Sequence, residues 1–257
     1  MNRQAQAAVL FLLGASLLHA ATTDLYLRYV KQGLRPLVLA SGAVLIAAAL
    51  ATVWYERKRT RTRAQKQREA DPDARHDADQ DLHTEAHAHR EPRVAWLLVL
   101  PLFALILVAP PALGSYSATR AGTALQEPLA YPSLPTADPL PLSVVDYAGR
   151  AVYDHGRTLH DRRVQLTGFL ALDRDGTPYL VRMALNCCAA DAQPVKVALT
   201  GRIPPVLQPD TWLQITGTYT PRRAKDPVNG GPIPFIEVTE AKPVAEPTDP
   251  YDESWNN

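Results

Sequence analysis

The residues best suited to chemistry are two adjacent cysteines, Cys187 and Cys188, with Asp191 three residues later. Thiolates favour soft ions such as Zn²⁺ and Cu⁺. Neighbouring side chains on a strand point to opposite faces, so the pair can share an ion only where the chain turns, and Ala189-Ala190-Asp191 is typical of such a turn. We therefore predict a metal site of Cys187, Cys188 and Asp191, with Arg182 as a charge partner that favours the thiolate.

A closed zinc site needs four ligands, which His155 or His160 could complete. Two other interpretations of the cysteines stay open. They could be small buried residues of a barrel core. They could also be a redox switch, since a disulfide between residues about 3.8 Å apart is strained and easily reduced. The CxxC spacing typical of thiol oxidoreductases is missing.

A second group of candidate ligands lies in the segment Asp71–Arg90, which alternates acidic residues with His76, His83, His87 and His89. Few apolar residues occur there, so we expect this segment to be disordered. Flexible tracts of this composition can bind Zn²⁺, Ni²⁺ or Cu²⁺ weakly. The alternative is a solvated polar loop in which the histidines are incidental.

Catalytic and nucleic-acid-binding patterns are missing from the sequence. It contains no P-loop, dinucleotide-binding glycine pattern, nucleophile elbow or HExxH helix, so we expect no enzymatic activity. Acidic residues slightly outnumber basic ones after Ser143. Because binding to nucleic acid depends on a positive surface, we expect no nucleic-acid partner.

Three apolar runs precede the cysteines, at Ala5–Thr23, Pro36–Tyr55 and Val94–Leu113. Each is about 20 residues, the length that crosses a bilayer as a helix. We predict three transmembrane helices, although the first run could instead be a signal peptide. The basic residues of Glu56–Arg93 place this loop in the cytoplasm by the positive-inside rule. The N-terminus is then cytoplasmic, and the chain after the third span lies outside the cell.

Between the first two spans, Tyr26 and Tyr29 are expected at the headgroup level of the membrane. After the third span, the prolines of Ser115–Leu142 predict an extended, semi-rigid stalk. A short amphipathic helix follows within Ser143–Gly156.

Beyond Arg163 the apolar period becomes two, which predicts five strands, at Val164–Leu170, Pro178–Asn186, Val195–Leu199, Trp212–Tyr219 and Pro234–Val244. Gly168 in the first strand suggests a bulge or tight bend. The fold class is therefore a membrane α-helical part joined to a small all-β, OB-like antiparallel barrel, with a half-open sandwich as the alternative. The predicted boundaries are 1–114 for the transmembrane domain, 115–142 for the linker, 143–245 for the barrel with its leading helix, and 246–257 for a loosely held acidic tail.

A family resemblance rests on Cys187-Cys188-Ala189-Ala190-Asp191-Ala192, with Pro110-Pro111, Gly168-Phe169, Arg182, Pro194-Val195, Trp212 and Gly217 around it. The chain resembles the YcgQ-like bacterial membrane proteins, which join transmembrane helices to a C-terminal domain with a Cys-Cys-Ala-Ala-Asp signature. The resemblance implies a multi-span permease as partner and, in some bacteria, zinc-responsive regulation. The histidine loop is sparser and more acidic here than is usual in that family.

These observations predict a membrane-anchored accessory subunit of a permease, whose domain outside the cell binds zinc, copper or a related ligand. The alternatives are a non-catalytic docking module with structural cysteines, or a thiol redox switch. A homo-oligomer is compatible with the sequence.

Overall fold

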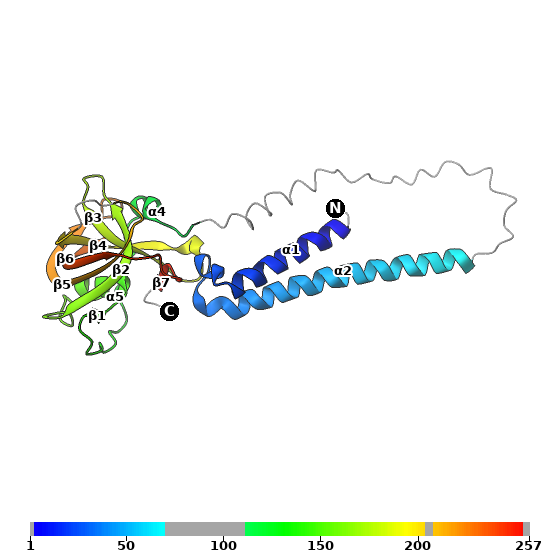
Figure 1. Cartoon of the computed structure of the whole chain (residues 1–257), viewed down its shortest axis with the longest axis horizontal. Coiled ribbons are helices and arrows are strands. Elements are labelled where there is room, and N and C mark those ends of the chain that lie inside the picture. The colour runs from blue at the N-terminus through cyan, green and yellow to red at the C-terminus, as the bar shows by residue number, and fades with distance from the viewer. Residues whose placement is uncertain (1–2, 70–110, 204–207, 254–257) are drawn as a thin grey trace. The chain divides into compact units, whose positions relative to one another are not determined.

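The computed structural model describes residues 3–69, 111–203 and 208–253 (Figure 1). The chain divides into two units. One contains both N-terminal helices. The other contains the connector between those helices, Asp24–Leu34, together with the chain from Pro111 onwards. All four histidines of the loop predicted to be cytoplasmic fall within 70–110, and so lie outside the described residues, as does the predicted third span, Val94–Leu113, except for its last three residues.

The N-terminal unit is a pair of helices, α1 (Arg3–Thr22) and α2 (Arg35–Glu69). Both are long and apolar enough to cross a membrane, as two of the three predicted spans require. Apolar side chains cover α2 on several sides, and the large exposed ones include Leu37, Val44, Leu50 and Val53. A helix that is apolar all round suits a lipid environment. The basic stretch that follows continues the same helix.

Small residues let α1 and α2 pack closely. A Cβ atom added to Gly14 would lie 2.8 Å from the carbonyl oxygen of Gly42, which is too close for any larger residue. Four alanines of these two helices are buried, namely Ala5, Ala7, Ala21 and Ala49. Close backbone approach over small residues is the usual way in which helices associate within membranes.

The C-terminal unit is a closed barrel of five strands, β2 (Arg163–Leu172), β3 (Pro178–Leu185), β4 (Gln193–Gly201), β5 (Trp212–Lys225) and β6 (Pro232–Pro243). Around the barrel the order is β2-β5-β6-β4-β3, and pairing of β3 with β2 closes it. Only the β4–β6 pair is parallel within this ring. All five predicted strands are present, although β3 and β4 are buried on both faces and do not alternate.

Closure depends on Gly168. The middle of β2 pairs with both β3 and β5, and a Cβ at Gly168 would lie 2.7 Å from the carbonyl oxygen of Val181 on β3. The predicted tight bend is therefore a point of close strand approach.

Helix α5 (Val144–Val152) covers one end of the barrel core. Ser143 caps it by accepting a hydrogen bond from the amide of Asp146 at 2.9 Å. Most of its residues are buried and pack with inward residues of the barrel strands. The amphipathic helix expected in this segment is thus confirmed.

The proline-rich segment is not a stalk. It begins with α4 (Ser115–Arg120), whose first turn is held by Asp210, which accepts from the Ser115 amide at 2.6 Å. Further on, the Ala124 amide donates to the Pro194 carbonyl at 2.9 Å, and Leu140–Pro141 form β1, parallel to β2. The segment lies along the barrel because its apolar residues find partners there, which the proline count alone did not indicate.

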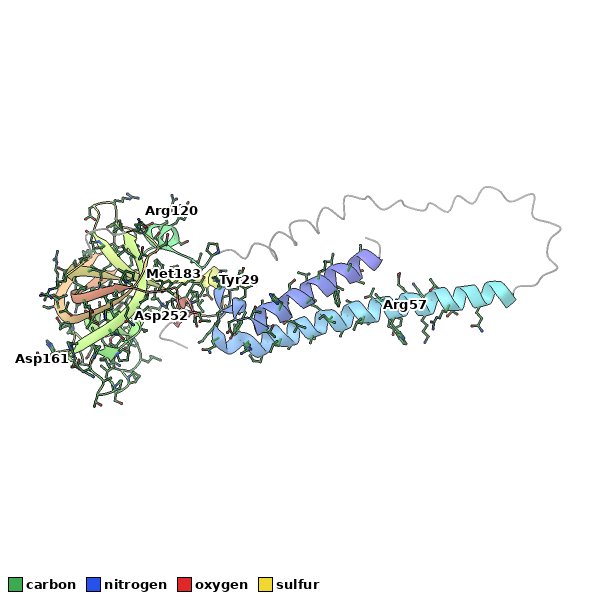
Figure 2. The ribbon with its side chains drawn as sticks, in the orientation of Figure 1. Tyr29, Arg57, Arg120, Asp161, Met183 and Asp252 are labelled. Carbon is green, nitrogen blue, oxygen red and sulfur yellow. The ribbon has the colours of Figure 1, made fainter. Side chains whose placement is uncertain are left out.

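The acidic tail is also bound rather than loose. Tyr251–Glu253 form β7, parallel to β3, with Tyr251 opposite Met183 (Figure 2). Asp252 is buried and accepts hydrogen bonds from the first amides of α5, those of Val144 and Val145. This carboxylate therefore joins the end of the chain to the leading helix.

Candidate functional site

The two cysteines lie in the short loop that connects β3 to β4. The loop contains one 3-10 turn, η4 (Ala189–Asp191), and Cys188 is its N-cap in an extended conformation. The predicted turn is therefore present directly after the cysteines. It takes both side chains off the flat strand, where they would have pointed to opposite faces.

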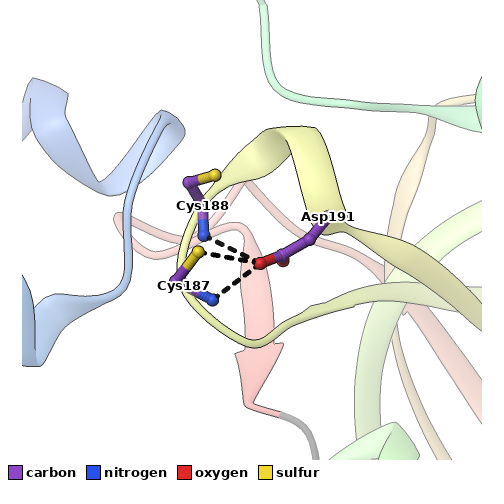
Figure 3. Close-up of side chains that lie close together, drawn as sticks. All are labelled: Cys187, Cys188 and Asp191. Carbon is purple, nitrogen blue, oxygen red and sulfur yellow. Dashed lines mark hydrogen bonds between the residues drawn. The ribbon is translucent and has the colours of Figure 1, made fainter.

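A single carboxylate, that of Asp191, organises this loop (Figure 3). Its Oδ1 accepts from the Asn186 amide at 3.0 Å, and its Oδ2 accepts from the amides of Cys187 at 3.0 Å and Cys188 at 3.4 Å. Burial by itself raises the pKa of Asp191, but the hydrogen bonds from the Cys187 thiol and these amides outweigh it and lower the pKa. Asp191 is therefore ionised at neutral pH.

The Cys187 thiol is neutral beside that charge. Both cysteines are free, and Cys187 is exposed. The Cys187 Sγ donates to Asp191 Oδ2 at 3.0 Å. This hydrogen bond, with the Cys188 thiol next to it, raises the pKa of Cys187 to about 12. Since only the thiolate is a strong nucleophile, this hydrogen bond makes the Cys187 thiol a weak nucleophile.

The ligand atoms of Cys187, Cys188 and Asp191 all lie within 4.8 Å of one another. A metal bond to sulfur is about 2.3 Å long, so three atoms at this separation can close on one ion after small side-chain rotations. The donors suit a soft or borderline cation, because two are sulfur and the third carries a negative charge.

The other predicted residues contact different partners. His155 faces Arg223, with 3.1 Å between Nδ1 and Nη2, and the His160 ring packs on Tyr219. Neither belongs to the cluster of ligand atoms found among the described residues. The Arg182 Nε forms an ion pair with Asp252 Oδ1 at 2.9 Å. The Arg182 charge is thus paired with the C-terminal strand and not with the thiols. The pKa of Cys187 is raised, whereas we expected Arg182 to lower it.

Two features next to the site were missed. The connector Asp24–Leu34 pairs with the cysteine loop through Val30 and Cys188. In addition, a cavity of about 80 Å³ lies next to Asp191, and its polar lining includes Gln126, Asn186 and Gln193. Tyr26, assigned to the membrane surface, is instead 3% exposed within this unit. An unusually aromatic connector was the one available signal for this.

Comparison with known proteins finds one family. Residues 146–252 match the model of the DUF1980 C-terminal domain. The matched segment begins in α5 and ends in β7, so it includes the five barrel strands and the cysteine loop. This family is uncharacterised. No curated protein and no solved structure matches the chain.

Proposed function

We propose that this protein is a membrane-anchored subunit whose C-terminal domain binds a soft metal ion outside the cell through Cys187, Cys188 and Asp191. The observation that supports the proposal best is the convergence of two thiols and a carboxylate within 4.8 Å at an accessible loop. A structural role in the core fits less well, because Cys187 is exposed.

Binding would exchange protons for the ion. A cation placed between the sulfurs and Asp191 lowers the pKa of each thiol that binds it, and the protons leave to solvent. Asp191 would then neutralise part of the ion's charge, as its ionised state permits. Zn²⁺ and Cu⁺ are the ions that these donors favour. Three protein ligands leave a coordination position open for water or for a ligand from a partner.

Sidedness in the membrane supports the predicted topology. The connector belongs to the same unit as the C-terminal domain, so both must lie on one side of the membrane. An even number of crossings between them is then required. Helix α2 provides one, and the apolar run Val94–Leu113 provides the second in our proposal. With the basic end of α2 in the cytoplasm, the N-terminus is also cytoplasmic and the domain is extracytoplasmic.

The type of barrel and the partner in this proposal rest on similarity to known folds and to a known family. A closed five-stranded barrel of mostly antiparallel strands supports the OB-like interpretation. The YcgQ-like resemblance supports a multi-span permease as the partner in the plasma membrane. In this proposal the domain presents its ion, or senses it, for that permease.

The test is ion binding by the full chain in detergent micelles, measured anaerobically by competition with a chromophoric chelator. We expect the wild type to bind about one Zn²⁺ or Cu⁺ per chain and the Cys187→Ser/Cys188→Ser variant to bind none. Asp175→Asn, which changes an exposed turn of the same barrel, is the control and should bind as the wild type does. Equal binding by the wild type and the double variant contradicts the proposal.

A further inference from the structure

The connector between the two apolar helices forms main-chain hydrogen bonds with the cysteine loop. Val30 and Cys188 make an isolated antiparallel bridge. On one side of it, the Ala189 amide donates to the Tyr29 carbonyl at 2.7 Å, and on the other the Lys31 amide donates to the Cys187 carbonyl at 3.1 Å. Figure 3 shows the connector, in blue, beside the loop. The peptide groups on both sides of Cys188 are therefore bonded to a segment far away in the sequence.

The connector is firmly attached to this unit. Leu27, like Tyr26, is buried, at 6% exposure. The Tyr251 hydroxyl donates to the Arg28 carbonyl at 3.2 Å and accepts from the Leu113 amide at 3.2 Å. One side chain of β7 thus joins the connector to the start of the domain. These contacts make the connector an ordered part of the unit that contains the cysteine loop.

The cysteine loop is therefore held from two directions. Asp191 binds the loop amides from within, and the connector binds the Cys187 carbonyl and the Ala189 amide from the other chain segment. The orientation of these peptide groups sets the direction in which each thiol leaves the backbone. Removing a group that orients the ligands of a metal typically lowers the affinity for the metal by about 10- to 100-fold.

We propose that the connector is a positioning part of the cysteine site, and that ion binding and connector docking strengthen each other. This inference rests on the proposed function, because the coupling acts at Cys187 and Cys188. Coupling between two binding events is reciprocal, so an ion should tighten the connector as much as the connector tightens the ion. The connector continues directly into both helices, with Thr23 alone between it and α1. A change in the connector on ion binding at the thiols would therefore be transmitted directly along the chain to both helices.

A proline substitution tests the connector. Lys31→Pro removes the amide that donates to the Cys187 carbonyl. Because it also removes the lysine ammonium, Lys31→Gln, which keeps the amide, is measured beside it to separate the two effects. Gln32→Pro is the matched control, because Gln32 is the exposed first residue of η2 (Gln32–Leu34), where a helix has no use for the amide and proline is tolerated. In the full chain in micelles we expect Lys31→Pro to weaken Zn²⁺ binding about 10-fold, and Gln32→Pro to change it less than about twofold. Cu⁺ replaces Zn²⁺ as the probe if the wild type takes only Cu⁺.

A second measurement uses the folded wild type and does not depend on any connector variant. Adding the ion should slow deuterium exchange at the amides of Lys31 and Ala189, and should leave both unchanged in Cys187→Ser/Cys188→Ser. Unchanged exchange in the wild type, or an unchanged affinity in Lys31→Pro, overturns the inference and leaves the proposed function standing. A wild type that binds no ion, or a double variant that binds equally well, overturns the proposed function and this inference with it.

Discussion

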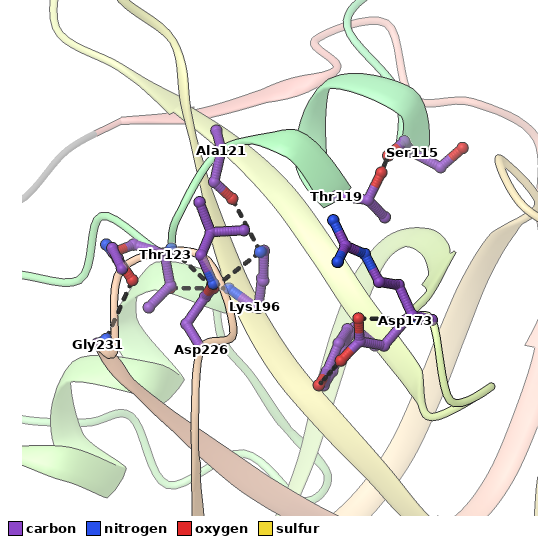
Figure 4. A network of polar contacts seen from close by, with 12 residues as sticks. Ser115, Thr119, Ala121, Thr123, Asp173, Lys196, Asp226 and Gly231 are labelled. Atoms are coloured by element: carbon purple, nitrogen blue, oxygen red, sulfur yellow. Dashed lines mark hydrogen bonds and ion pairs between the residues drawn. The ribbon is translucent and has the colours of Figure 1, made fainter.

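Two aspartates of the C-terminal domain, Asp191 and Asp226, each gather backbone amides around one carboxylate, yet their surroundings differ. Asp226 is 2% exposed. It accepts from the amides of Thr123 at 2.9 Å and Val228 at 2.8 Å, and its charge is balanced by the Lys196 ammonium at 2.8 Å (Figure 4). Asp191 accepts from three amides and a thiol, at an accessible loop. In its cluster of ligand atoms, the neighbours of Asp191 are the thiols of Cys187 and Cys188.

The comparison separates a carboxylate that is already paired with a cation from one whose neighbours include two thiols. Lys196 also donates to the Ala121 carbonyl at 2.9 Å, so the Asp226 pair fastens the extended segment around residue 121 to β4. The charge of Asp226 is therefore balanced within the protein. Asp191 also accepts hydrogen bonds from several amides of its loop, but it has two thiols beside it where Asp226 has the Lys196 ammonium. In our proposal, a soft cation would bind between these thiols and Asp191.

The largest effect should come from breaking the buried pair. Lys196→Met leaves Asp226 charged and buried without its cation, which typically costs about 3–5 kcal/mol in the free energy of unfolding. Lys225→Met changes an exposed lysine at the end of β5 and should cost less than about 0.5 kcal/mol. Chemical denaturation of the full chain, followed by near-ultraviolet circular dichroism, compares the two. Equal stability of both variants would show that the ion pair of Lys196 and Asp226 does not stabilise the fold.

The cost of Lys196→Met should depend on pH. Burial raises the pKa of Asp226, but the Lys196 hydrogen bond and the amides outweigh it and lower the pKa from 3.8. In the wild type this group therefore contributes stability above that value, which is lost as pH falls through the lower folded pKa. Without Lys196, a main cause that lowers this pKa is lost, so the folded pKa of Asp226 is higher in the variant than in the wild type, and the difference in stability between the two proteins shrinks as pH falls.

The stability gap between wild type and variant should thus be widest near about pH 7 and narrow towards about pH 4. Denaturation curves at both values measure it. A gap that is the same at both would show that the effect of Lys196 is packing and not charge.

In the cysteine loop, Asp191→Asn should make the Cys187 thiol more reactive. Replacing the charged acceptor removes the main cause of the raised thiol pKa, and each unit by which a pKa falls gives about 10 times more thiolate. We expect alkylation by iodoacetamide near about pH 8 to accelerate about 10-fold or more. The Asp175→Asn control lies in the exposed β2–β3 turn and should leave the rate unchanged. A slower or equal rate in Asp191→Asn would contradict the hydrogen-bond account.

The smallest effect should be that of Cys187→Ser/Cys188→Ser on stability. Cys187 is exposed and Cys188 is half-buried, so removing both sulfurs should change the free energy of unfolding by less than about 0.5 kcal/mol without metal. The same denaturation assay applies. A loss comparable to that of Lys196→Met would return the cysteines to the role of core packing.

Local pattern was sufficient for most of the fold. The period-two apolar residues of β2 to β6 and the helical spacing of α5 were visible because each element carries its own burial signal. The bound tail and the wrapped linker were not, because their attachment depends on distant partners. Asp252 looks like an ordinary tail acid until Arg182 and the start of α5 are placed beside it, and Asp210 shows no sign in sequence of capping α4.

The candidate site divides in the same way. The turn after Cys188 and the nearness of Asp191 follow from their separation by three residues. The pairing of Val30 with Cys188 joins positions more than 150 residues apart, and no local pattern encodes it. Arg182 was placed beside the thiols from sequence distance alone, and a strand carries it instead towards Asp252.

The most direct test of the account is to count bound metal and free thiols together in the anaerobically purified full chain, by elemental analysis and thiol titration. We predict about one ion per chain, with the thiols masked until a chelator is added. Two thiols that react at once in the native protein, with no metal bound after incubation with Zn²⁺ or Cu⁺, would contradict it.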